Sequence, residues 1–330
     1  MSVSPVQARR PEHPRLPEAP PPERPERPAR AEAALRPAVH SLVTQRGASA
    51  STEQIKARLQ SFMEAASGPY RVGGKELVVP PAFRMVGGMN QESPGVYVTR
   101  IRRELSPKAY RAVARDLGLV TSGKGTPEQI RRVTQAVIDS PAGARYPATE
   151  AGVRQLMWDH GIGMDCSGYV HHAFLAARGA PAARYGLGDV LASGLQAPSP
   201  RTFRRVDPAD AKAGDVMVLT GGSDGTGHKV IVFDRHAVPQ KTAMHQRIAR
   251  ALGDSPNSRF VILECDSAWG AGGEASRGGV ERHAWAYDAG SGRWASLVKD
   301  DRGQWQAFAS RKPGPYDHDL MGVFRPRTES

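Results

Sequence analysis

The chain has 330 residues, of which 39% are hydrophobic and 24% are charged, and its formal net charge is +12. This length suffices for one or two hydrophobic cores, and the positive charge favours anionic partners such as a wall polymer, a membrane surface or nucleic acid. Only two cysteines occur, which excludes a disulfide framework, and the absence of an 18-residue apolar run predicts no membrane span.

The first segment, residues 1–48, is rich in proline, arginine and glutamate. Such a composition lacks the apolar mass that offsets ordering entropy, so it predicts a disordered arm. The arm serves either as a linker or as a docking or loading signal for secretion or injection machinery. Arg9 and Arg10 precede no apolar segment, so no Sec-type signal is expected. The cytoplasm and a non-Sec route to the cell envelope or a target cell both stay open.

Residues 49–140 are predicted to form a small, mainly helical accessory domain. Apolar residues recur at helical spacing after Ser51, and further helices are predicted over Ser106–Leu117 and Pro127–Ile138. The run Tyr97–Ile101 predicts a brief strand. This block contains no chemical motif, so we expect it to dock a partner, select a substrate or pack against the next domain.

Cys166 lies where a loop turns into a helix, because apolar residues recur at helical spacing after it and Gly179 is a suitable C-cap. A thiol in the first turn of a helix faces unpaired backbone N–H groups and the positive end of the dipole, and both favour thiolate. This placement is typical of a cysteine nucleophile. The alternative is a small buried side chain without chemical function. Because a bridge to Cys265 would remove the nucleophile, both thiols are predicted to be free.

Several strands are predicted after this helix. The run G-D-V-M-V-L, which includes Val216–Leu219, precedes a glycine-rich turn, and G-H-K-V-I-V-F follows with His228 at its start. Residues 259–267 form a further predicted strand, and residues 320–326 form the last. His171 and His172 follow Cys166 too closely on its own helix to reach back to the thiol.

The motif D-C-S-G-Y-V, followed by these paired strands, resembles the nucleophile motif of the NlpC family of cell-wall cysteine peptidases over residues 141–330. The resemblance implies an α+β, papain-like domain in which the nucleophile helix packs on an antiparallel sheet. It also implies that Cys166 is the nucleophile and that His228 is its base. The family's third polar residue, which orients the histidine, aligns with Glu264; Asp266 lies two residues further on the same face of the strand.

The resemblance implies hydrolysis of an amide bond through a thioester, with a peptidoglycan stem peptide as substrate. Two alternatives share the motif: an injected effector or toxin that acts on a protein as amidase, deamidase or transglutaminase, and an inactive papain-fold binding module. No H-E-x-x-H, C-x-x-C or phosphate-binding glycine motif occurs, so no metal and no cofactor are expected. No zinc-finger spacing and no aromatic RNA-binding signature occurs either, which argues against nucleic acid as the partner.

Overall fold

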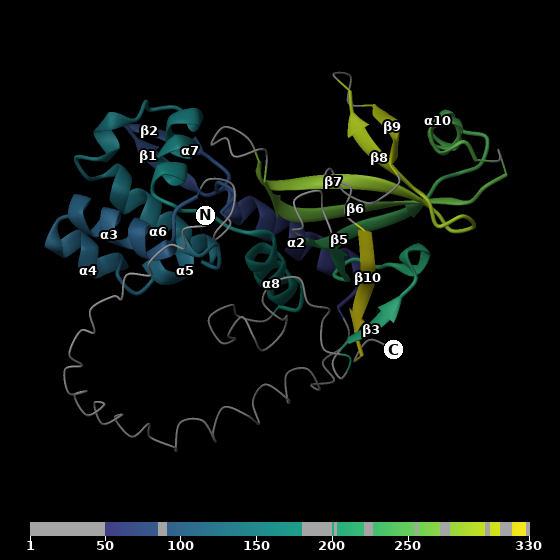
Figure 1. The fold of residues 1–330 in the computed structure, drawn as a ribbon, viewed down its shortest axis with the longest axis horizontal. Coiled ribbons are helices and arrows are strands. Elements are labelled where there is room, and N and C mark those ends of the chain that lie inside the picture. The colour runs from purple at the N-terminus through teal and green to yellow at the C-terminus, as the bar shows by residue number, and fades with distance from the viewer. Residues whose placement is uncertain are drawn as a thin grey trace, which may run out of the picture. The chain divides into compact units, whose positions relative to one another are not determined.

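The computed structural model describes residues 50–84, 91–179, 200, 203–220, 227–254, 257–270, 278–300, 304–310 and 319–327. The predicted disordered arm, residues 1–48, lies outside them. Within the described residues the fold is α+β, with eight α-helices, a two-stranded hairpin and an eight-stranded antiparallel sheet (Figure 1). No helix in these ranges is long and apolar enough to cross a bilayer.

The α-helices carry the labels of Figure 1. They are α2 (Thr52–Ala66), α3 (Pro94–Glu104), α4 (Pro107–Val113), α5 (Leu117–Thr121), α6 (Pro127–Ile138), α7 (Glu150–Asp159), α8 (Cys166–Ala177) and α10 (Ala243–Leu252). The hairpin consists of β1 (Pro69–Val72) and β2 (Lys75–Val78). The strands of the large sheet are β3 (Phe203–Val206), β4 (Val216–Thr220), β5 (His228–Ala237), β6 (Phe260–Trp269), β7 (Gly279–Asp288), β8 (Trp294–Lys299), β9 (Trp305–Ser310) and β10 (Asp319–Pro326).

Local capping chemistry explains where several helices begin. Ser51 and Gln54 form a reciprocal capping box at the start of α2, and Thr126 and Gln129 form another at the start of α6. These two motifs satisfy backbone N–H groups that the first helical turn leaves without intrahelical acceptors. The bounds predicted for α6 are therefore confirmed.

Two predictions for residues 49–140 were wrong. The predicted strand Tyr97–Ile101 lies inside α3, because Pro94 occupies the first turn after Ser93 and outweighs the β-propensity of the following residues. The predicted helix Ser106–Leu117 ends at Val113 and is followed by the separate helix α5.

The large sheet has the strand order β3-β10-β4-β5-β6-β7-β8-β9 and is antiparallel throughout. Figure 1 shows β5, β6 and β7 side by side, and α10 next to the β8–β9 hairpin. The helix α8 packs on one face of the sheet, against β5 and β6. The predicted antiparallel sheet with a helix after Cys166 is present.

One hydrophobic core joins the helical block to the sheet. It contains Leu59 of α2, Val133 of α6, Val170 of α8 and Ile231 of β5, all with 0–1% exposure. Residues 44–330 accordingly form one compact unit. The predicted accessory and catalytic segments, 49–140 and 141–330, share this core, so the helical block helps to hold α8 in place.

Candidate active site around Cys166

The loop before α8 is held by the helical block. Met164 exchanges backbone hydrogen bonds with Ala82 and Arg84, and the N–H of Asp165 donates to the carbonyl of Gly123. At Gly123 a side chain is excluded, because φ is +77° and an added Cβ would lie 2.6 Å from the carbonyl oxygen of Arg84. Close backbone approach therefore sets the position from which α8 begins.

Asp165 is the N-cap of the helix that carries the cysteine. Its Oδ1 accepts the N–H of Gly168 at 2.6 Å, and its Oδ2 lies 2.5 Å from Nζ of Lys124. The same ammonium group contacts Oγ of Ser167. The carbonyl of Lys124 lies 3.0 Å from Nε2 of His172. A lysine from the helical block thus contacts both the cap and the second turn of α8.

Cys166 is the first residue of α8, and both cysteines are free, as predicted. The surrounding protein removes water from the thiol and raises the pKa of Cys166 to about 11, and the neighbouring Asp165 carboxylate adds to this rise. A hydrogen bond from the backbone N–H of Lys229 and the charges of Lys124 and Lys229 act in the opposite direction. Burial therefore outweighs the thiolate-favouring effect expected of a helix start, and Cys166 needs a base.

The side chain of His228 lies on the face of the sheet away from α8. His228 pairs with Leu219, and its imidazole stacks on the indole of Trp269 with ring centroids 3.9 Å apart. Leu219, Trp269 and Val230 belong to the core cluster on this second face, whereas Ile231 packs with α8. Because side chains alternate along a strand, Lys229 and not His228 shares the face of Ile231. The imidazole of His228 therefore stacks on Trp269 on the other face of β5, and its pairing with Cys166 stays a prediction.

The two acids predicted to orient His228 have other partners. Asp266 is fully buried and binds Arg282 with both carboxylate oxygens, at 2.6 and 3.0 Å. Burial raises the pKa of Asp266, although the Arg282 guanidinium opposes the rise. Oε1 of Glu264 lies 3.6 Å from Nε2 of His236. Asp266 thus forms a buried ion pair with Arg282, and the catalytic role of both acids stays a prediction.

The groups that the structure gathers on the α8 side are Cys166, Lys229, Lys124, Asp165 and His171, which we call the Cys166 cluster. Lys229 is fully buried, and burial lowers its pKa to about 8. The next largest effect is that of Cys166, which raises the pKa of Lys229. Sequence reasoning missed Lys229, although a lysine inside the apolar run K-V-I-V-F is a signal: a buried ammonium needs a compensating partner or a chemical role.

His171 completes the Cys166 cluster from the second turn of α8. It is 1% exposed, and within the described part of the chain neither ring nitrogen has a hydrogen-bond partner. Burial lowers the pKa of His171 to about 4, and electrostatic interactions with His172, Lys124 and Lys229 contribute to this decrease. The ring is therefore neutral at pH 7 and adds a polar group, but no charge, beside the lysines.

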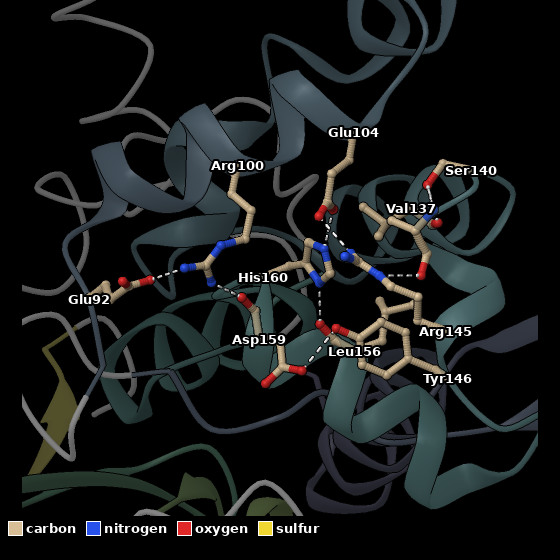
Figure 2. A network of polar contacts seen from close by, with 11 residues as sticks. Glu92, Arg100, Glu104, Val137, Ser140, Arg145, Tyr146, Leu156, Asp159 and His160 are labelled. Atoms are coloured by element: carbon tan, nitrogen blue, oxygen red, sulfur yellow. Dashed lines mark hydrogen bonds and ion pairs between the residues drawn. The ribbon is translucent and has the colours of Figure 1, made fainter.

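A second polar cluster lies around α7 and is shown in Figure 2. Glu104 accepts hydrogen bonds from Nε2 of His160 and from Arg145, both at 2.6 Å, and Nδ1 of His160 faces the carbonyl of Leu156 at 2.7 Å. Tyr146 donates to Asp159 at 2.9 Å. Tyr146 therefore serves this α7 network, which consists of Glu104, Arg145, Tyr146, Asp159 and His160.

Other site types find no support in the described ranges. No group of three metal-ligating side chains occurs there. A groove of about 440 Å³ between α4 and α6 is lined by small apolar and polar side chains and contains neither cysteine nor histidine. Comparison of the chain with protein-family models, curated proteins and solved structures gives no match. The function is therefore argued from the Cys166 cluster itself.

Proposed function

We propose that the protein is a cysteine hydrolase that cleaves an amide bond through a thioester on Cys166, within an NlpC-type, papain-like domain. The observation that carries the proposal is the position of Cys166: the first residue of a buried helix that packs on an antiparallel sheet, with a basic residue of that sheet beside the sulfur. This arrangement combines a nucleophile, a proton acceptor and helix-start N–H groups.

The chemistry needs no cofactor. A base takes the thiol proton, and the sulfur attacks the carbonyl carbon of the amide. The backbone N–H of Cys166, at the first helical position, is the proposed donor to the oxyanion. Collapse of the tetrahedral adduct breaks the C–N bond, and the protonated base gives its proton to the departing amine. Water then hydrolyses the thioester with the same base and regenerates the thiol.

The proposed substrate is a peptidoglycan stem peptide, as the NlpC resemblance implies. The net charge of +12 suits an anionic wall polymer, since opposite charge raises the rate of encounter. The effector acting on a protein amide shares the same chemistry and differs only in substrate. The inactive binding module draws support from the orientation of His228 toward Trp269.

The test is to incubate purified peptidoglycan with wild type and with Cys166→Ala, and to analyse the soluble fragments by mass spectrometry. We expect new stem-peptide products whose rate of formation falls about 10⁴-fold in the variant, because the covalent step is lost. Cys265→Ala is the matched control, since Cys265 is fully buried in the other core cluster.

Equal product formation by wild type and Cys166→Ala would refute the nucleophile assignment. Absence of products from peptidoglycan, with cleavage of a protein amide that depends on Cys166, would support the effector. Absence of both reactions would leave the binding module as the function.

A further inference from the structure

The strand β5 presents a lysine, and not a histidine, to the helix that carries Cys166. Ile231, two residues after Lys229, packs in the core cluster that contains α8. Lys229 lies opposite Val218, which belongs to the same cluster. Strand alternation therefore directs the Lys229 side chain toward α8, while the Lys229 backbone N–H bonds the Cys166 sulfur.

The surroundings of Lys229 suit a group that gains and loses a proton. The side chain has no exposed surface, and among the described residues the charged groups that influence its pKa include Lys124 and Asp165, which are paired with each other. Two further titratable groups that interact with Lys229 are Cys166 itself and His171. Asp266, the fully buried acid of the neighbouring strand, is bound to Arg282. Burial and the like charge of Lys124 both weaken the hold of Lys229 on its proton, since each disfavours the charged form.

We infer that Lys229, in place of His228, exchanges protons with Cys166 in the proposed reaction; the inference rests on the proposed function. The neutral amine of Lys229 takes the proton of the Cys166 thiol as the S–C bond forms. The resulting ammonium donates that proton to the amine that leaves. In the second half of the cycle the amine takes a proton from water, which attacks the thioester, and returns it to the sulfur as the S–C bond breaks.

The proposed pair makes a prediction that can be tested without a substrate. The rate at which iodoacetamide alkylates Cys166 is measured between pH 6 and pH 10 by mass spectrometry of the Cys166 peptide. In wild type we expect the alkylation rate to rise in a step near pH 8, where Lys229 loses its proton, and to reach a plateau above that pH. Lys229→Met should remove the step and slow alkylation at pH 8 about tenfold, because the amine that accepts the thiol proton is gone.

Two further variants separate charge from proton transfer. Lys229→Arg keeps a permanent positive charge, so alkylation at pH 8 should stay within about threefold of wild type; hydrolysis should be lost, because a guanidinium does not release its proton. His228→Gln should keep the step and the rate. Lys108→Met, at an exposed lysine, is the control for a general change in charge. Lys229→Met is expected to fold, since replacing a buried charge by an apolar side chain is often neutral or stabilising, and circular dichroism checks this.

The result that would overturn the inference is a step that persists in Lys229→Met or disappears in His228→Gln. Failure of the proposed function looks different. A step that depends on Lys229, together with no hydrolysis of any amide, would support the thiol–lysine pair and refute the hydrolase.

Discussion

The α7 network and the Cys166 cluster are both groups of polar side chains that contain a buried histidine, but their hydrogen bonding differs. In the α7 network both ring nitrogens of His160 face oxygen atoms, and Glu104 binds both His160 and Arg145. In the Cys166 cluster, neither ring nitrogen of His171 has a hydrogen-bond partner among the described residues. Burial raises the pKa of Cys166 and lowers that of Lys229, and both shifts favour the neutral form of the group. The first arrangement stabilises the fold, and the second holds a thiol, a lysine and a histidine in surroundings that favour their neutral forms.

This difference indicates where chemistry is expected. A satisfied network gains little from a change of protonation, because every donor already has an acceptor. A cluster whose members are desolvated changes protonation readily when a substrate arrives. Sites of proton transfer are accordingly found among perturbed groups, which is why we place the function at Cys166 and not at His160.

The largest expected effect concerns the α7 network. Glu104→Gln should lower the free energy of unfolding at pH 7 by about 2–3 kcal/mol, because it leaves the buried His160 ring without its carboxylate. Urea unfolding measures this change. Glu92→Gln is the matched control, since its pair with Arg100 is partly exposed and should cost less than about 1 kcal/mol.

The same variant has a predicted pH dependence. Burial alone would raise the pKa of Glu104, but the hydrogen bonds from His160 and Arg145 hold it below its ordinary value of 4.5. The stability that Glu104 supplies is therefore present above pH 4.5 and is lost as the pH falls through its lowered pKa. If wild type and Glu104→Gln lost stability equally below pH 4.5, the structural assignment of this network would be wrong.

A smaller effect tests the Cys166 cluster through stability. Lys229 has a pKa of about 8 in the folded protein and an ordinary value of 10.5, so the unfolded chain binds more protons between these values and stability rises with pH. Cys166 acts oppositely only above its ordinary value of 9.0. From pH 8 to pH 9 we expect wild type to gain about 1 kcal/mol relative to Lys229→Met. Parallel urea midpoints for the two proteins would contradict the burial of a charged Lys229.

The smallest effect concerns the N-cap of α8. Asp165→Asn keeps an oxygen that accepts the Gly168 N–H, but it removes the carboxylate that raises the pKa of Cys166. We expect alkylation of Cys166 at pH 8 to become about threefold faster. Asp116→Asn, at the N-cap of α5, is the control and should leave the rate unchanged. Slower alkylation in Asp165→Asn would mean that the cap orders the thiol more than its charge perturbs it.

Much of the secondary structure could be predicted from local patterns. The capping residue and proline at Thr126–Pro127 determine where α6 begins, and the apolar run from Val216 is a strand in the structure, as predicted. The error at Tyr97–Ile101 has a local cause too, since β-branched and aromatic residues occur in both element types.

The sequence by itself determined that Cys166 begins a helix, that a strand begins at His228, and that His228 and Lys229 point to opposite faces of it. Only the tertiary structure decided which of the two faces α8. The physical reason is that β5 is covered on both sides: Val230 and Val232 pack in one core cluster, and Ile231 packs in the other. A strand that is apolar on both faces has no polar alternation to mark its buried side.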